Sequence, residues 1–196
     1  MSFQVATFLM ISCFYFAYFY KQFRLRKKGI RTNRLAKGSK PNRTAIIESF
    51  LLAATYVTAV IQYASVFWPA YMLPLPSSLP VRIAGLILNG FGVTCFIAAV
   101  FVMRDSWRAG IDEEQKTAIV TKGIYKYSRN PAFLGFDLLY IGTFLAVPNV
   151  IMLAAAIIAI CLLHLQILEE EKFLPSFFGD DYKRYKQNTP RYLLFF

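Results

Sequence analysis

Long apolar stretches alternate with short polar ones along this chain. Three of the stretches are each close to the roughly 20 residues that a helix needs to cross a bilayer, and they cover residues 5–20, 45–68 and 81–102. Two more, 131–147 and 150–168, are separated only by Pro148-Asn149, a pair typical of a tight turn between antiparallel helices. The pattern predicts an all-α integral membrane protein with about five transmembrane helices, the last two forming a hairpin.

The polar segments differ strongly in positive charge. The loop 21–43 holds ten Lys and Arg residues and no acid, the segment 104–129 holds six, and the tail after residue 168 holds five. The connection 69–80 and the Pro148-Asn149 turn hold none. Because short loops rich in Lys and Arg stay in the cytoplasm, the pattern predicts an amino terminus outside and a cytoplasmic carboxyl terminus.

The tail predicts one more element. Gly179 is typical of a helix stop, and Asp180 and Asp181 directly after it are typical of a helix start. We expect a short amphipathic helix there, lying in the membrane interface on the cytoplasmic side. The chain then forms a single membrane domain, in which residues 1–102 supply the first three spans and residues 103–196 the remaining elements.

Composition supports a membrane protein and narrows its partners. Apolar residues make up 57% of the chain, above the roughly 45–50% of soluble proteins. The net charge of +11 could indicate nucleic acid, but the basic residues lie between apolar spans, where anionic lipid headgroups explain them. We therefore expect anionic lipids at the loop 21–43 and no nucleic acid. The three cysteines lie inside apolar spans, which predicts small buried residues without a disulfide.

Candidate chemistry is confined to two polar pieces. Cys/His zinc sets, a Walker loop and a serine triad are all missing from the sequence. What remains is the segment 122–131, which enters the fourth span, and the segment 169–174, which leaves the fifth. Because these two spans form an antiparallel hairpin, both pieces meet at the same membrane face.

In these pieces the sequence resembles the isoprenylcysteine carboxyl methyltransferases and the related phospholipid methyltransferases. The family pattern is Gly-x-Tyr-x-x-x-Arg-His-Pro, then Glu-Glu-x-x-Leu, a Phe-Gly-x-x-Tyr-x-x-Tyr run and a final Pro-Arg. The matching residues, in order, are Gly123, Tyr125, Arg129, Asn130, Pro131, Glu170, Glu171, Leu174, Phe178, Gly179, Tyr182, Tyr185, Pro190 and Arg191. The pattern has His where this chain has Asn130, and Asn offers a donor and an acceptor but no imidazole chemistry.

The resemblance implies S-adenosylmethionine as cofactor. Glu170 and Glu171 could hold its cationic or hydroxyl groups, and Arg129 could bind its carboxylate in bidentate fashion. Tyr125 or Trp107 could cover its adenine, although Trp107 could equally lie in the aromatic belt. The cofactor-binding residues that the resemblance indicates are Gly123, Tyr125, Arg129, Asn130, Pro131, Glu170 and Glu171; no metal is expected.

Two ionisable residues lie inside the apolar spans, where such groups are costly and usually functional. Asp137 lies in the fourth span and His164 in the fifth. Folding the hairpin about Pro148-Asn149 brings them within about one turn of each other, so the pair could touch. The alternative is that each forms local hydrogen bonds within the bundle. Together with Arg129 they are the candidate catalytic residues.

The sequence therefore predicts a membrane methyltransferase acting on a lipophilic acceptor that arrives from the bilayer. The closer resemblance favours the carboxylate of a prenylcysteine, while a phospholipid amine or a small thiol stays open. A membrane reductase using a nicotinamide and a polybasic scaffold without catalysis are the rival classes. The Gly90-Phe91-Gly92 run in the third span favours close helix packing over a place near the cofactor.

Overall fold

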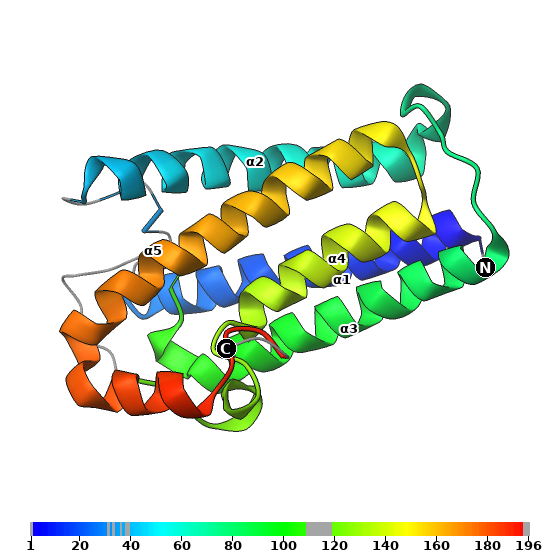
Figure 1. The fold of residues 1–196 in the computed structure, drawn as a ribbon. Coiled ribbons are helices and arrows are strands. Elements are labelled where there is room, and N and C mark those ends of the chain that lie inside the picture. The colour runs from blue at the N-terminus through cyan, green and yellow to red at the C-terminus, as the bar shows by residue number, and fades with distance from the viewer. Residues whose placement is uncertain are drawn as a thin grey trace.

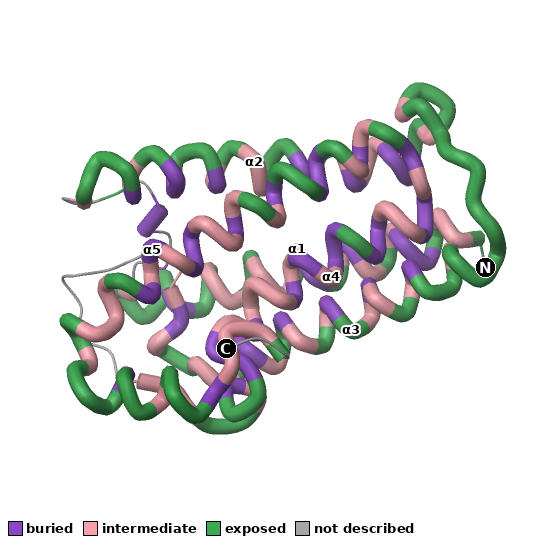
Figure 2. The backbone as a smooth tube through the Cα atoms, viewed as in Figure 1, coloured by how far each residue is buried: buried purple, intermediate pink, exposed green. Residues whose placement is uncertain are grey.

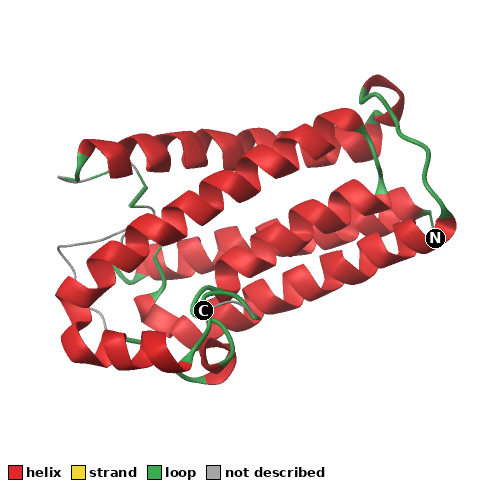
Figure 3. Cartoon of the chain, viewed as in Figure 1, coloured by secondary structure: helices red, strands yellow, loops and turns green. Residues whose placement is uncertain are grey.

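The computed structural model describes residues 2–30, 32, 34, 35, 37, 40–108 and 119–193, and within them the chain is almost entirely helical (Figure 1, Figure 3). Parts of the basic loop 21–43 and residues 109–118 lie outside the described residues. The α-helices are α1 (Phe3–Lys27), α2 (Asn42–Phe67), α3 (Leu79–Met103), α4 (Pro131–Ala146) and α5 (Val150–Asn188).

The helices have the length and composition of membrane spans. Among the described residues, α1, α2, α5 and the stretch from α3 to Ser106 are each long and apolar enough to cross a bilayer, while α4 is apolar but has 16 residues. At 1.5 Å per residue, α4 is about 24 Å long, shorter than the roughly 30 Å hydrocarbon core. The all-helical membrane fold expected from the sequence is confirmed.

The turn between α4 and α5 lies beside the connection between α2 and α3. The Leu75 N–H donates to the Pro148 carbonyl at 3.0 Å, and the Val150 N–H donates to the Leu73 carbonyl at 3.1 Å. The Asn149 side chain caps α5 by accepting from the Met152 N–H at 2.7 Å. The two connections that carry no positive charge are therefore at the same end of the bundle (Figure 1).

Helix α5 runs past the apolar span and breaks at Gly179, whose φ of 55° is left-handed. The chain reverses direction there, and a final helical stretch runs back under the bundle to Asn188 (Figure 1). Tyr182 on this stretch is buried, and the Tyr185 hydroxyl donates to the Tyr125 carbonyl at 2.7 Å. One face of the stretch therefore packs on the segment before α4, while its place in the membrane interface stays a prediction.

Glycines let α3 and α4 pack with their backbones in contact. A Cβ on Gly92 would lie 2.8 Å from the Gly135 carbonyl oxygen and from the Leu139 nitrogen, whereas a Cβ on Gly90 would meet nothing within 4 Å. Gly85 and Gly142 form the same kind of contact one heptad further along the two helices. Close packing is therefore the role of Gly92, as the sequence favoured.

Gly92→Ala is expected to destabilise the fold by about 1–3 kcal/mol, because the new methyl group meets backbone atoms that cannot rotate away. Gly90→Ala is the matched control, since its methyl group points into open space. Thermal unfolding in detergent measures the difference. Equal melting temperatures for the two variants would contradict the packing assignment.

The cysteines correct one expectation. All three are free, as expected, but Cys13 and Cys161 are exposed on the bundle surface rather than buried. The expectation of burial is wrong because a span that is apolar on all sides also directs apolar side chains outward, against lipid. Exposed positions of this kind run along the outer faces of α2 and α3 (Figure 2).

Candidate active site

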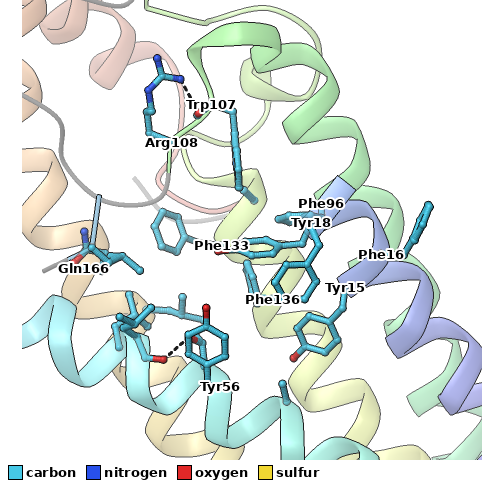
Figure 4. A pocket seen from close by; sticks show the side chains of 18 of the residues that line it. Tyr15, Phe16, Tyr18, Tyr56, Phe96, Trp107, Arg108, Phe133, Phe136 and Gln166 are labelled. Carbon is cyan, nitrogen blue, oxygen red and sulfur yellow. Dashed lines mark hydrogen bonds between the residues drawn. The ribbon is translucent and has the colours of Figure 1, made fainter. Parts of the chain in front are cut away.

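A cavity of about 400 Å³ lies among α1, α2, α4 and α5. Its wall is largely aromatic and aliphatic, with side chains such as Tyr18, Phe133 and Phe136 pointing toward one another (Figure 4). Gln166 and Arg108 bring polar groups to the wall at the end of the cavity away from the α4–α5 turn. Pockets of this size and character bind lipophilic small molecules and orient them by a few polar contacts.

The cavity lining includes residues of α1 and α2 that are also exposed on the outer surface of the bundle. Phe16 of α1 and Tyr56 of α2 line the cavity, and they are 70% and 55% exposed. Within the membrane such exposed aromatic residues face lipid tails. At these two residues the cavity wall therefore continues onto the outer surface of the bundle.

Trp107 lines the same end of the cavity as Gln166 and Arg108. Its indole is buried at 3% exposure and contacts the Tyr18 ring edge-on, with the ring centroids 5.6 Å apart. The Arg108 guanidinium donates to the Trp107 and Asp105 carbonyls at 2.8 and 2.7 Å (Figure 4). The sequence left two interpretations of Trp107 open, a place over the site and a place in the aromatic belt. The structure places it in the wall of the cavity.

Apart from Asp137 and His164, the predicted site residues lie at the end of the bundle away from the α4–α5 turn, where they form two separate groups. The first group is built around Arg129, whose side chain is 3% exposed. Its Nη2 donates to Glu171 Oε1 at 2.9 Å, and its Nη1 donates to the Lys186 and Thr189 carbonyls. Glu171 also accepts from Arg191 Nη2 at 2.9 Å. Arg129 thus uses its donors on Glu171 and on the carboxyl-terminal segment.

The charges in this group are well matched. Burial alone would raise the pKa of Glu171, but the hydrogen bonds from Arg191 and Arg129 hold it at about 2. Glu171 is therefore ionised throughout the physiological range. A role of Arg129 and Glu171 in direct contact with a cofactor stays a prediction, whereas their role in docking the carboxyl-terminal segment is seen in the contacts.

Asn130 and its neighbours complete the same group. The Asn130 side-chain amide donates to the Arg191 carbonyl at 3.2 Å, and the Ser128 hydroxyl donates to that carbonyl at 3.1 Å. Pro131 is buried at the first position of α4, where its fixed φ suits a helix start. At the position where the family pattern has His, Asn130 thus supplies a donor to the chain's own backbone.

The second group surrounds Glu170, which points away from Arg129. Glu170 Oε1 accepts from Gln166 Nε2 at 3.0 Å, and the same nitrogen donates to Glu48 Oε1 at 3.2 Å. Tyr125 lies nearby, buried in the short helical turn η3 (Gly123–Lys126). Gly123 starts this turn with a φ of 61°, and a Cβ there would lie 2.9 Å from the Val102 side chain.

Glu48, Lys40 and Gln166 belong to this group and were not identified from the sequence. Glu48 is the first acid in the chain and lies inside an apolar span. The rule that drew attention to Asp137, that ionisable groups inside spans are functional by default, applies to Glu48 equally. No comparable signal marks Gln166, because nothing in a sequence shows which amide bridges two carboxylates.

Asp137 and His164 lie deeper in the bundle, and His164 has another partner. His164 Nδ1 lies 3.0 Å from the Tyr192 hydroxyl, and the two rings stack with centroids 6.0 Å apart. Asp137 is 9% exposed, and its Oδ1 has no hydrogen-bond partner within the described residues. Neither alternative from the sequence describes His164, because its partner is not Asp137 but Tyr192 of the carboxyl-terminal segment, 28 positions away.

The chain is similar in sequence to known proteins. A profile of the phospholipid methyltransferases matches residues 81–181, just over half of the chain. The protein-S-isoprenylcysteine O-methyltransferase of Schizosaccharomyces pombe is 36% identical over 73 residues, which are 37% of this chain and 31% of that protein. The enzyme of that name from Homo sapiens is 27% identical over 160 residues, 76% of this chain and 55% of its own length.

This chain thus spans about half, or less, of the length of these curated relatives. The profile match takes in α4, most of α5, and both polar pieces, 122–131 and 169–174. On that match, the chain belongs to the phospholipid methyltransferase family.

Proposed function

We propose that this protein transfers a methyl group from S-adenosylmethionine to the carboxylate of a prenylcysteine-type acceptor in the membrane. The observation that carries the proposal is the apolar cavity whose wall includes exposed residues of α1 and α2 together with Gln166 and Trp107. An isoprenoid chain suits its aromatic wall, which leaves the polar head of the acceptor beside the α5 carboxylates. The family and the names of the relatives support methyl transfer.

The residues at the end of the cavity away from the α4–α5 turn fit S-adenosylmethionine. This molecule presents a sulfonium cation, an α-amino group, a carboxylate and an adenine. Glu170 is a half-buried carboxylate with no ion-pair partner in the part of the chain that the structure describes, so it suits a cation. Trp107 and Tyr125 offer flat apolar surfaces for an adenine. When bound, the cofactor supplies an electrophilic methyl group on a positively charged sulfur.

The chain's own residues then position the reactants and exclude water from the site. The cavity wall holds the lipid chain, and Trp107 excludes water from the end where the carboxylate lies. Glu170 holds the cationic part of the donor, and the Arg129–Glu171 pair keeps the carboxyl-terminal segment docked against α4. A carboxylate acceptor is already ionised at neutral pH, so no side chain has to remove a proton.

The direct test is methyl transfer by the purified protein in detergent or nanodiscs. With radiolabelled S-adenosylmethionine and an N-acetylated S-farnesylcysteine, we expect a farnesylated product whose label is released by mild base, as a methyl ester requires. Base-stable label on a phospholipid amine or on a thiol would show a different acceptor. Binding of a nicotinamide nucleotide in place of S-adenosylhomocysteine would contradict methyl transfer and favour a reductase.

A second prediction concerns whether a side chain must remove a proton from the acceptor. For a carboxylate acceptor, His164→Gln and Asp137→Asn are expected to change KM or stability and to leave the kcat pH profile without a lost ionisation. For an amine or thiol acceptor, removing the base should lower kcat by about 10²–10⁴-fold. Steady-state kinetics between pH 6 and about 9 separates the two outcomes, because each variant keeps a neutral hydrogen-bonding group at its position.

The proposed topology has five crossings, the amino terminus outside and the site in the cytoplasm. It is supported by the one-sided Lys and Arg count and by the contact between the two uncharged connections. A cysteine introduced at exposed Ser77 in a cysteine-free background is expected to react with an impermeant reagent in intact cells, and one at exposed Ser176 only after permeabilisation. The reverse pattern would contradict the topology.

We also propose that anionic lipids bind the loop 21–43. The end of α1 supports this, because it carries exposed Arg24, Arg26 and Lys27 past the apolar span. Each basic residue near an anionic surface contributes about 1 kcal/mol of attraction. Such binding would fix the depth of α1, whose Phe16 forms part of the cavity wall.

A further inference from the structure

A buried polar network joins the basic loop, α2 and α5 at the end of the cavity away from the α4–α5 turn. The Glu48 side chain has no exposed surface, and its Oε2 lies 2.6 Å from Lys40 Nζ. The Lys40 side chain is 4% exposed, and its Nζ donates to the Arg34 carbonyl at 2.8 Å. Gln166 Nε2 then links Glu48 to Glu170, at 3.2 and 3.0 Å. The network is thus a chain of four side chains that ends at Glu170.

The network carries two carboxylates and one ammonium group. Lys40 compensates the charge of Glu48 at salt-bridge distance. Gln166 is a neutral amide, so it holds the second carboxylate near the first without compensating its charge. Glu170 itself has no ion-pair partner among the described residues, so direct contact does not compensate its charge when it is ionised. A half-buried charge without a partner is unfavourable until a cation approaches it.

The surroundings of Glu170 agree with this charge count. Burial raises its pKa to about 7, and the Glu48 carboxylate adds to the rise, while the Gln166 hydrogen bond and Lys40 oppose it. Tyr125 on η3 and Tyr182 on the final helical stretch also face it, and burial raises the pKa of both, so they stay neutral.

We propose that Gln166, which lines the cavity, and Glu48 hold Glu170 as a carboxylate without an ion-pair partner, and that its charge selects the cationic methyl donor over its neutral product. The inference rests on the proposed function, because S-adenosylmethionine and S-adenosylhomocysteine differ by one methyl group and one positive charge at sulfur. Gln166 and Glu48 are positioning residues, since they act through Glu170. Selection of this kind favours release of the product after each turnover.

The test is the ratio of the dissociation constants of S-adenosylhomocysteine and S-adenosylmethionine, measured by calorimetry at pH 8 without acceptor. A structural role alone would change both constants together and leave the ratio constant. In Glu48→Gln, the amide still accepts from Gln166, but Lys40 loses its counter-ion and compensates Glu170 instead. The ratio is expected to fall about tenfold, which corresponds to about 1.4 kcal/mol.

Two further variants separate charge from packing. The charge-neutral double variant Lys40→Met/Glu48→Gln removes one charge of each sign, so it is expected to restore the ratio to within about threefold of the wild-type value. Gln166→Met keeps the volume but removes both hydrogen bonds. In this variant the ratio should fall. In the wild type the ratio should rise with pH around pH 7. In the variant this rise should occur at higher pH, because ionised Glu170 has lost the hydrogen bond from Gln166.

The outcomes are distinct. If folded Glu48→Gln and Gln166→Met both keep the wild-type ratio, the inference is wrong while the proposed function stands. If the wild-type protein binds neither nucleoside, the proposed function fails and the inference with it. If Glu48→Gln does not fold, the Gln166→Met ratio alone decides the matter, since that variant changes no charge.

Discussion

Replacing Glu171 with alanine is expected to destabilise the fold by about 3–5 kcal/mol, the usual cost of removing one partner of a buried ion pair. Arg129 is buried at 3% side-chain exposure and would lose the carboxylate that compensates its charge. Arg191 would lose the same partner, so the carboxyl-terminal segment would be held less firmly. Thermal unfolding and calorimetry with S-adenosylhomocysteine should show a lower melting temperature and weaker binding. Arg129→Ala should do the same.

Asp181→Ala is the matched control, because the Asp181–Arg184 pair is 65% and 74% exposed. Exposed pairs contribute at most about 1 kcal/mol, so this variant should behave like the wild type. The Glu171 contribution also has a defined pH dependence. It is fully present above the ordinary pKa of 4.5 and is lost as the pH falls through the folded-state value of about 2. Equal stability of Glu171→Ala and Asp181→Ala at pH 7 would refute the assignment.

Ala132→Phe is expected to lower kcat/KM for a farnesylated acceptor by about 10- to 100-fold, equivalent to the roughly 1–3 kcal/mol that overpacking costs. Ala132 lines the cavity next to Phe133, so a larger side chain there takes up space that the proposed acceptor chain needs. The loss should be smaller for acceptors with a shorter chain. The affinity for S-adenosylhomocysteine should be retained, because the substitution leaves the group around Glu170 intact.

The control for this substitution is Ala53→Phe on the exposed face of α2, where a larger side chain meets lipid. Steady-state kinetics with acceptors of ten, fifteen and twenty carbons, about one isoprene unit apart, gives the chain-length dependence. A uniform loss for all three lengths, or an equal loss in Ala53→Phe, would show that the cavity does not hold the acceptor chain.

The candidate site was predictable in part. The two motif pieces do meet at one end of the bundle, because an antiparallel hairpin leaves them no other place. That the two adjacent glutamates have different partners was not predictable. Glu170 and Glu171 are adjacent in sequence, yet Glu171 joins Arg129 and Glu170 joins Gln166, since successive residues on a helix point about 100° apart. The aromatic cavity also escaped prediction, because a span facing lipid and a span facing a cavity have the same composition.

The sequence by itself determined the membrane class, the positions of the helical segments and the two polar pieces. This follows because a bilayer makes each helix satisfy its own backbone, so a span can be recognised from its local apolar length. Only the tertiary structure decided which polar groups are partners. Arg129 and Glu171 are 42 positions apart, and Glu48 and Gln166 are 118 apart. Such pairs depend on helix rotation and crossing, which are properties of the packed bundle and of no single segment.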